Sequence, residues 1–297
     1  MKIVVIRNPV SGRGTGTKLW PQVEKWLQDY RPAIASLEIV TTTGPNHAVM
    51  EARIAAESAD LIVACGGDGT IGDVANGLIG SHVPMGVVPM GTGNDLARHL
   101  GLQGNLERAV KIAMTGTPKP IDGGLWSVGE DSRVFFNACG CGFDAEVAAR
   151  VNSGFRRLKG TAAYIAAVLD SLRSYEAVPI RITMGDQVVE TEAMLCCVAS
   201  AESYGGGMKI APKASLTDGL LDVVLVRKAT RMEFLRAFPS VFRGGHLGHR
   251  LVSAWQVPEV VIEPLSDAPP LVLADGELVG RLPGRFSVVP NALEVMQ

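Results

Sequence analysis

Residues 1–122 alternate short apolar runs with segments of helical periodicity, and this alternation constrains the fold more strongly than any other feature of the chain. The apolar runs cover residues 3–7, 37–41, 61–65 and 85–89, and the helical patterns cover residues 19–28, 47–59, 71–79, 95–100 and 106–114. Parallel strands joined by crossover helices produce this order. We therefore predict an N-terminal, doubly wound α/β nucleotide-binding domain.

The rhythm changes near residue 122, after which strand-like runs predominate. These runs cover residues 133–138, 180–184, 188–191, 193–200, 221–226, 260–263 and 271–274, and two helical patterns, 161–174 and 231–242, interrupt them. Successive short strands favour antiparallel pairing. We predict that residues 123–297 form a mostly antiparallel β-sandwich domain, with the return of its last strand to the first domain left open.

Composition narrows the class of protein. In a chain of 297 residues, an apolar fraction of 47% is enough to fill two cores. The five cysteines all lie in apolar or glycine-rich runs, so we predict buried free thiols. No apolar run approaches the roughly 20 residues of a membrane-spanning helix, and the N-terminus begins directly with a strand pattern, so we expect a cytoplasmic protein. A net charge of −2 argues against nucleic acid as the main partner.

A glycine-rich turn follows the apolar run of residues 61–65 and precedes a helical pattern. It consists of Gly66, Gly67, Asp68, Gly69 and Thr70. Glycines allow the backbone to approach a polyphosphate, and the amides at the start of the next helix attract the anion. Because an acid inside such a turn would repel phosphate, we interpret Asp68 as a direct or water-mediated Mg²⁺ partner. The alternative is a tight turn in which Asp68 caps a helix.

Two further loops follow neighbouring strands. Gly91, Thr92, Gly93, Asn94 and Asp95 again link a strand to a helix, although Asn94 or Asp95 could be helix caps alone. After the first strand, Asn8, Ser11, Gly12 and Arg13 supply polar groups or remain an ordinary solvated loop. Residues 140–145 satisfy a loose dinucleotide pattern, which we interpret as structural or substrate-lining. The strand ends predict one nucleotide held from several sides.

Taken together, these motifs resemble the diacylglycerol kinase catalytic-domain family, specifically its soluble bacterial lipid kinases. The resemblance covers essentially the whole chain and rests on Asn8-Pro9 with Ser11-Gly12, Gly66 through Thr70, Asn76-Gly77-Leu78, Gly91 through Arg98, Gly142 through Ala145, Ala211-Pro212-Lys213-Ala214 and Asp218-Gly219, in the family's order and spacing. The turn of residues 66–70 alone also fits NAD kinases and sphingosine kinases. One departure is Asp73, where the family commonly carries glutamate.

The resemblance implies an ATP-dependent kinase that phosphorylates a hydroxyl of diacylglycerol or a related lipid, with the active site in a cleft between two domains. By the same resemblance, Gly66, Gly67, Asp68, Gly69, Thr70, Ile71, Gly72, Thr92 and Thr42 hold ATP, and we add Gly93, Asn94, Asp95, Asn8, Ser11, Gly12 and Arg13. It further implies a structural Mg²⁺ on Asp218 with backbone oxygens of Ser215 and Leu220. We assign a second, water-linked Mg²⁺ network to Asp68, Asp95 and Asp122.

Phosphoryl transfer also needs a group that accepts the proton of the acceptor hydroxyl. Glu277 follows Asp275 and Gly276 directly after the apolar run of residues 271–274. The family match favours Glu277 as this base, and we expect burial or the neighbouring Asp275 to raise its pKa. We predict Asp68 and Asp275 as further catalytic residues. Without the family match, the same triplet is an ordinary hairpin turn.

A lipid acceptor requires apolar cover. We consider residues 204–208 and the stripe of Ala162, Ile165, Ala166, Leu169 and Leu172, which is otherwise ordinary core. The basic residues Arg156, Arg157 and Lys159 suggest peripheral contact with a membrane surface, or a solvated run. The competing functions are a kinase of a sphingoid base or NAD and a non-catalytic nucleotide- or lipid-binding protein. A homodimer is left open.

Overall fold

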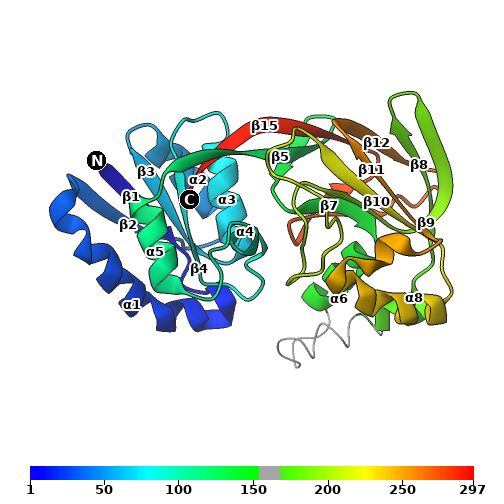
Figure 1. Cartoon of the computed structure of the whole chain (residues 1–297), viewed down its shortest axis with the longest axis horizontal. Helices are drawn as coiled ribbons and strands as arrows, with labels where there is room; N and C mark the ends of the chain where they lie inside the picture. The colour runs from blue at the N-terminus through cyan, green and yellow to red at the C-terminus, as the bar shows by residue number, and fades with distance from the viewer. Residues whose placement is uncertain (154–167, 169) are drawn as a thin grey trace. The chain divides into compact units, whose positions relative to one another are not determined.

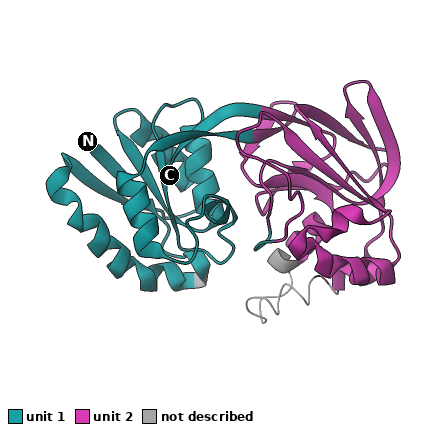
Figure 2. Ribbon diagram, viewed as in Figure 1, with its two compact units in different colours: residues 1–123, 205–207, 289–297 teal, residues 124–204, 208–288 magenta. Residues whose placement is uncertain are grey.

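The chain forms two compact units in the computed structural model, which describes residues 1–153, 168 and 170–297 (Figure 2). Unit 1 comprises Met1–Gly123, Gly205–Gly207 and Val289–Gln297, and unit 2 comprises Gly124–Tyr204 and Met208–Val288. Strands β5 (Pro118–Val128) and β15 (Gly284–Met296) each contribute residues to both units. Arg156, Arg157, Lys159 and most of the predicted helix 161–174 lie outside the described residues.

Unit 1 is built on a parallel sheet of order β2-β1-β3-β4, with the end of β15 parallel to β4. The four strands are β1 (Lys2–Arg7), β2 (Ser36–Thr41), β3 (Leu61–Gly66) and β4 (Met85–Pro89). All six residues of β3 are buried, because helices cover both faces of a parallel sheet, and this explains the continuous apolar run.

Helices cover the two faces of this sheet in pairs (Figure 1). α1 (Thr15–Asp29) and α5 (Leu106–Thr115) contribute to one core cluster, in which Trp20, Val23 and Leu27 are the buried side of α1. α2 (His47–Ala56) and α3 (Asp68–Leu78) pack against each other on the other face. Three short helices complete the unit: η1 (Ser11–Gly14), η2 (Arg31–Ala33) and α4 (Asp95–His99).

The strand order reverses between β1 and β3, since β2 lies on one side of β1 and the later strands lie on the other. In open α/β sheets the crevice at such a reversal, at the carboxyl ends of the strands, is where ligands bind. The predicted doubly wound α/β arrangement is confirmed, and its reversal lies between the loops that follow Arg7 and Gly66.

Unit 2 is an antiparallel sandwich-like structure with strand order β14-β13-β7-β9-β8-β12-β15, in which β10 joins β9 to β11 and β5 pairs with β6. Its further strands are β6 (Asp131–Phe135), β7 (Ala138–Gly142), β8 (Val178–Met184), β9 (Gln187–Ala199), β10 (Leu221–Arg227), β11 (Val252–Val257), β12 (Glu259–Pro264), β13 (Leu271–Ala274) and β14 (Glu277–Arg281). Among the described residues, its labelled helices are α6 (Phe143–Ser153), α8 (Arg231–Ala237), η3 (Phe238–Arg243) and η4 (Gly245–Gly248), and residues 170–174 are also helical.

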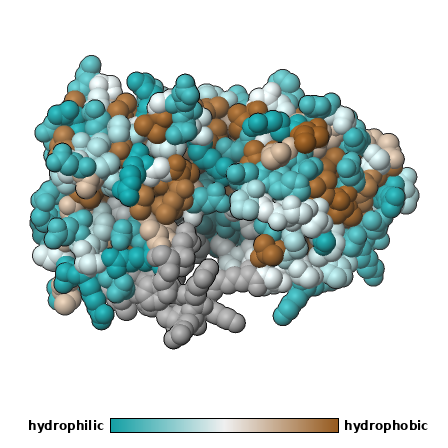
Figure 3. Space-filling model, turned by 180° about the vertical axis from the view of Figure 1, so that it is seen from behind, coloured by the Kyte–Doolittle hydropathy of each residue, from teal (hydrophilic) through white to brown (hydrophobic). Residues whose placement is uncertain are grey.

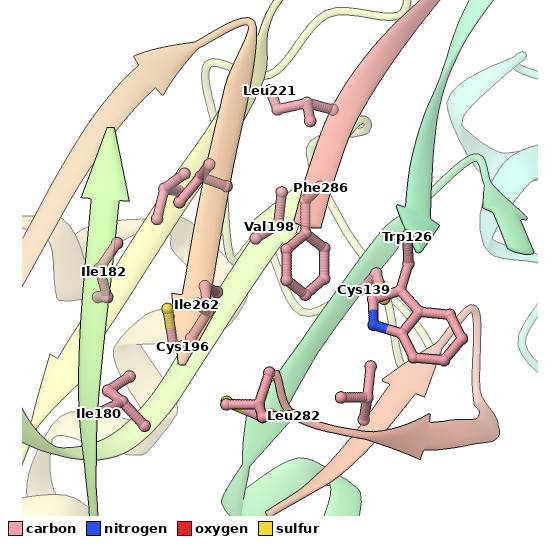
Figure 4. Close-up of a cluster of buried hydrophobic side chains, with 14 of the residues drawn as sticks. Trp126, Cys139, Ile180, Ile182, Cys196, Val198, Leu221, Ile262, Leu282 and Phe286 are labelled. Carbon is pink, nitrogen blue, oxygen red and sulfur yellow. The ribbon is translucent and has the colours of Figure 1, made fainter. Parts of the chain in front are cut away.

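The core of unit 2 is formed by inward-facing side chains of nearly all these strands (Figure 4). Trp126, Phe135 and Phe286 are its largest fully buried members. Four of the five cysteines lie in this unit, and all five are buried free thiols, as predicted. Burial raises the pKa of Cys65 and of each of the others well above the ordinary thiol range, so they serve as small apolar side chains.

Strand boundaries were predicted wrongly in two places. Residues 133–138 were predicted as one strand, but β6 ends at Phe135 and β7 begins at Ala138. The carboxylate of Asp275 accepts the backbone amides of Phe136, Asn137 and Ala138, which turns the chain between the strands. Conversely, the predicted strands 188–191 and 193–200 are a single strand, β9, because all residues from Gln187 to Ala199 are extended.

No helix among the described residues is long and apolar enough to cross a membrane. On the face drawn in Figure 3, apolar side chains form separate patches within a largely polar surface. Patches of this kind are normal for a folded chain and do not by themselves indicate a binding surface.

Candidate active site

The loops after β1 and β3 meet at the reversal of the sheet in unit 1. The side-chain amide of Asn8 donates to the hydroxyl of Thr70 at 2.9 Å, and the backbone amide of Asn8 donates to the carbonyl of Cys65 at 3.0 Å. α3 begins at Asp68 without a side-chain cap, so its first amides point out of the helix uncapped. This pairing places a bare helix N-terminus at the position where open α/β sheets bind ligands.

The glycine loops after β3 and β4 touch each other through their backbones. A Cβ atom on Gly91 would lie 2.4 Å from the Cα of Gly67, a distance that no real side chain tolerates. The amide of Met90 donates to the carbonyl of Gly66 at 2.7 Å. The side chain of Asn94, whose φ is 51°, accepts from the amide of Gly91 and donates to its carbonyl, both at 2.9 Å. The two predicted phosphate loops therefore form one structure.

Asp68 joins the loops rather than capping its own helix. One carboxylate oxygen accepts the amide of Asn94 at 2.7 Å, and the other accepts the amide of Asp95 at 2.6 Å. These amides open α4, so Asp68 satisfies two donors of a helix 26 residues further along the chain. Each carboxylate oxygen can still accept a second hydrogen bond, which leaves room for a water-mediated Mg²⁺ contact.

Asp95 is buried beside Asp68. Both of its oxygens lie 3.1 Å from the amide of Gly206, and the Nε atom of Arg98 lies 3.7 Å from one of them. Burial raises the pKa of Asp95, and the nearby Asp68 carboxylate raises it further, whereas the Gly206 amide and Arg98 lower it. A buried carboxylate with a raised pKa beside a second carboxylate is an environment in which a bound divalent cation is stabilising.

The remaining predicted ATP residues of unit 1 surround this pair of loops. Ser11 is buried, and its hydroxyl has no hydrogen-bond partner among the described residues. Gly12 has a φ of 59° and approaches the carbonyl of Met90, where a Cβ atom would lie at 2.7 Å. Arg13 lies in η1, and its side chain is outside the described part of the structure. Thr42 is buried just after β2, and its amide donates to the carbonyl of Arg7 at 2.9 Å.

Asp122 is the third predicted member of the Mg²⁺ network and lies in β5. Its carboxylate accepts the amide of Asn291 at 2.8 Å, which ties β5 to β15. Within residues 1–153, 168 and 170–297, no three acidic, histidine or cysteine side chains form a direct metal-binding cluster. The network of Asp68, Asp95 and Asp122 therefore stays a prediction that requires bridging water.

The predicted base lies in unit 2, at the start of β14. The side chain of Glu277 is 48% exposed, and one oxygen lies 3.3 Å from the guanidinium of Arg133. The expected burial of Glu277 is therefore wrong, because the hairpin holds it at the surface of the unit. Asp275 has a φ of 46°, and its carboxylate accepts hydrogen bonds from the three backbone amides at the turn from β6 to β7. It fixes the turn from which Glu277 projects.

The predicted structural Mg²⁺ residues form a compact turn in unit 2. Asp218 accepts the amide of Leu220 at 3.1 Å, and the hydroxyl of Ser215 accepts the amide of Thr217 at 3.3 Å. Carboxylate and carbonyl oxygens are the hard donors that Mg²⁺ prefers. The donor set of Asp218, Ser215 and Leu220 fits the ion.

Two protein families and several individual proteins are similar to this chain. The Diacylglycerol kinase catalytic domain family matches residues 2–126, and the YegS C-terminal NAD kinase beta sandwich-like domain family matches residues 137–297. The chain is 32% identical to "Diacylglycerol kinase" of Mycobacterium tuberculosis (strain H37Rv) over all of this chain and 95% of that protein. It is 34% identical to "Diacylglycerol kinase" of Bacillus subtilis (strain 168) over 95% of this chain and 91% of that protein.

The chain belongs to the diacylglycerol kinase family. A crystal structure from Bacillus anthracis (strain Sterne), provisionally described as a diacylglycerol kinase, matches 99% of this chain and 96% of its own with a TM-score of 0.79 and 25% identity. Membership in the diacylglycerol kinase family confirms the resemblance and the predicted kinase class.

Several residues of this diacylglycerol kinase family member were not given a role from sequence. Asp144, at the start of α6, accepts the hydroxyl of Tyr204 at 3.1 Å and the amide of Ala145 at 2.8 Å. Burial raises the pKa of Asp144 to about 6. Arg98, which donates to the carbonyl of Gly93 at 2.9 Å, and Arg133 were also missed. Asp144 and Arg98 lie in quoted motifs, whereas Arg133 carries no local signal.

Proposed function

We propose that this chain transfers the γ-phosphate of ATP to a hydroxyl group of diacylglycerol or a related lipid. The observation that carries the proposal is the contact between the two glycine loops at the carboxyl ends of β3 and β4, beside the loop after β1. A triphosphate needs many backbone donors at one place, and a paired loop over a bare helix N-terminus supplies them. Family membership supports the lipid acceptor.

The residues of unit 1 then have separate roles. The amides of Gly67, Gly69 and Thr70 hold the phosphates, and the unpartnered hydroxyl of Ser11 adds a donor. Asn8 orients Thr70 through their 2.9 Å hydrogen bond. Thr42, at the end of β2, is assigned to the adenosine side.

Mg²⁺ completes this site in the proposal. Asp68 and Asp95 would hold the ion through water, because the oxygens of Asp68 already accept main-chain amides. When bound, Mg²⁺ neutralises charge that develops on the transferred phosphoryl group. Asp122 is assigned to the outer part of the same water network. A second Mg²⁺ on Asp218, Ser215 and Leu220 would stabilise unit 2 rather than take part in the reaction.

Glu277 is assigned as the group that accepts the proton of the acceptor hydroxyl. Its half-exposed side chain is accessible to a substrate, and Arg133 holds one of its oxygens. Asp275 was predicted among the catalytic residues, but its carboxylate is engaged by three amides, which favours a positioning role. It would hold Glu277 in place by fixing the hairpin.

An apolar pocket in unit 2 supports a lipid acceptor. It encloses about 90 Å³, and its lining includes Phe143, Val147, Leu195, Met208 and Phe234. Asp144 and Tyr204, which are hydrogen-bonded to each other, contribute polar groups to its wall together with Glu233, His246 and His249. A mostly apolar wall with a few polar groups suits a short apolar segment of a lipid beside a polar group.

Replacing Glu277 with glutamine tests the assignment. We expect kcat to fall by about 10²–10⁴-fold with little change in the KM for ATP, since the base acts only in the transition state. Glu259→Gln is the matched control, because Glu259 is 46% exposed and is also paired with an arginine, Arg285. A Glu277→Gln protein with kcat within twofold of the unmodified protein would exclude Glu277 as the base.

The identity of the acceptor is tested separately. Radiolabelled ATP offered with a panel of diacylglycerol, a sphingoid base and NAD shows which hydroxyl receives phosphate. The NAD arm is included because the sandwich domain is similar to that of NAD kinases. Transfer to NAD alone would refute the lipid acceptor, and nucleotide binding without any transfer would indicate a non-catalytic protein. Sedimentation velocity at several concentrations tests whether the chain forms a homodimer, which the sequence leaves open.

A further inference from the structure

One helical surface of unit 2 exposes large apolar side chains. Met232 and Leu235 of α8 and Phe242 of η3 are 57%, 40% and 50% exposed, respectively. All three lie in two short helices that follow each other directly in the chain, so their exposed side chains are close in sequence. We call Met232, Leu235, Arg236, Phe242 and Arg243 the outer face of α8–η3.

The outer face is also positively charged, although the whole chain carries a net charge of −2. Arg236 and Arg243 are exposed and form no ion pair with any described residue. The one acid of these two helices, Glu233, is occupied by the capping box of Thr230 and by Arg250. The unbalanced guanidinium groups therefore face solvent beside apolar side chains.

A row of aromatic rings connects this face to the apolar pocket. The ring centroids of Phe242 and Phe238 are 6.1 Å apart, those of Phe238 and Phe234 are 5.5 Å apart, and those of Phe234 and Phe143 are 4.9 Å apart. Phe242 is half exposed and Phe143 is 5% exposed, so the row runs from the surface into the core. Phe143, Phe234 and Phe238 line the pocket.

We propose that the outer face of α8–η3 docks on an anionic lipid bilayer. Interfacial helices present bulky apolar side chains together with arginine or lysine, which is the combination found here. A symmetric contact between two copies of this face would set Arg236 and Arg243 against the same residues, and like charges oppose such pairing. An anionic surface instead neutralises them and receives Phe242 and Met232 among its acyl chains.

The apolar pocket behind the face is consistent with this partner. A bilayer is where a diacylglycerol substrate resides, and Phe238, which is packed against the exposed Phe242, also lines the apolar pocket. In this respect the docking proposal rests on the proposed lipid kinase function. Binding to vesicles nevertheless needs neither ATP nor turnover, so the two proposals can fail independently.

Vesicle flotation of the full chain, without nucleotide, tests the proposal. We expect strong binding to vesicles rich in phosphatidylserine and weak binding to pure phosphatidylcholine. Arg236→Gln with Arg243→Gln should weaken binding to the anionic vesicles by about 30-fold, since each arginine near such a surface contributes about fivefold. Phe242→Ser should weaken it by at least about tenfold. Lys111→Gln with Lys119→Gln removes two exposed charges from unit 1 and should have little effect.

Thermal unfolding and activity keep the result interpretable. The variants should retain the unfolding midpoint and should phosphorylate diacylglycerol dispersed in detergent micelles at the normal rate. Equal binding of the unmodified protein to both vesicle types, or unchanged binding of the double arginine variant, would overturn the docking proposal. Loss of self-association in that variant with no loss of vesicle binding would assign the face to a second copy of the chain instead. Absent activity in micelles with intact vesicle binding would count against the kinase function alone.

Discussion

Replacing Asp68 with asparagine removes one of the two acceptor oxygens that hold the start of α4. The amides of Asn94 and Asp95 lie 2.7 and 2.6 Å from separate oxygens of Asp68. An asparagine can accept only one of these amides and turns its own NH₂ group toward the other. A hydrogen bond to a charged acceptor contributes about 1.5–3 kcal/mol, and the lost charge at a helix N-terminus adds about 0.3–1 kcal/mol. We expect the free energy of unfolding to fall by about 2–4 kcal/mol.

Urea unfolding without nucleotide or Mg²⁺ measures this loss, and hydrogen exchange locates it. The amides of residues 91–100 should exchange faster in Asp68→Asn, because α4 loses its anchor. Asp29→Asn is the matched control: Asp29 is exposed at the end of α1, and its replacement should change the free energy of unfolding by less than about 0.5 kcal/mol.

A magnesium titration of kinase activity separates the structural role of Asp68 from its role near the metal. If Asp68 also contacts Mg²⁺ through water, Asp68→Asn should require a higher Mg²⁺ concentration for half-maximal rate, in addition to its lower stability. An Asp68→Asn protein with unchanged unfolding free energy and unchanged exchange over residues 91–100 would refute the reasoning, since it would show that the two hydrogen bonds do not hold α4.

Three further changes test other parts of the structure. Gly91→Ala should destabilise the protein by about 1–3 kcal/mol and weaken ATP binding, because its Cβ would lie 2.4 Å from the Cα of Gly67. Gly44→Ala is the control, since its Cβ would meet no atom within 4 Å. Equal ATP affinities of Gly91→Ala and the unmodified protein by calorimetry would contradict the loop contact. Because the pKa of Asp144 is raised to about 6, the folded state holds this proton more tightly than the unfolded state does. As the pH rises from about 4 to about 6, the unmodified protein should therefore lose about 3 kcal/mol of stability relative to Asp144→Asn, with no further loss above pH 6. Curves of unfolding free energy against pH that run parallel for the two proteins would exclude this. In the absence of ATP, Mg²⁺ at a hundredfold excess over the Kd of the Asp218 site should stabilise the unmodified protein by about 2.7 kcal/mol more than it stabilises Asp218→Asn. Equal stabilisation of both proteins would remove Asp218 from the metal site.

Local sequence signals were sufficient for the four parallel strands β1 to β4 and for helices α1 to α5, because each of these elements carries its own pattern. β3 reads as a continuous apolar run because helices cover both faces of the sheet, and all of its residues are buried. The glycines after β3 and β4 were recognisable because close backbone contact excludes side chains at Gly67 and Gly91. The carboxyl ends of neighbouring parallel strands meet at one edge, so the proximity of the two loops followed from the strand order alone.

Contacts between residues far apart in the sequence were not predictable in the same way. Asp275 looked like part of a hairpin turn, and nothing near it indicates that its carboxylate binds amides 137 to 139 residues earlier. The break between β6 and β7 was missed for the same reason. The exposure of Glu277 depends on how β13 and β14 lie at the edge of the sheet, which a single strand pattern does not report.

Asp68 and Asp275 share a physical role that their sequence context conceals. Each lies next to a glycine just after a buried strand. The carboxylate of each accepts hydrogen bonds from backbone amides of a segment that is distant in the chain. A carboxylate bound by several amides is a strong, rigid anchor, and its charge is already partly compensated. Asp95 and Glu277 lie near these anchors, where Asp95 accepts the amide of Gly206 and Glu277 is paired with Arg133. Asp95 is left with a raised pKa and Glu277 with an accessible side chain, so these two acids are better suited than their anchors to respond to a metal ion or a proton.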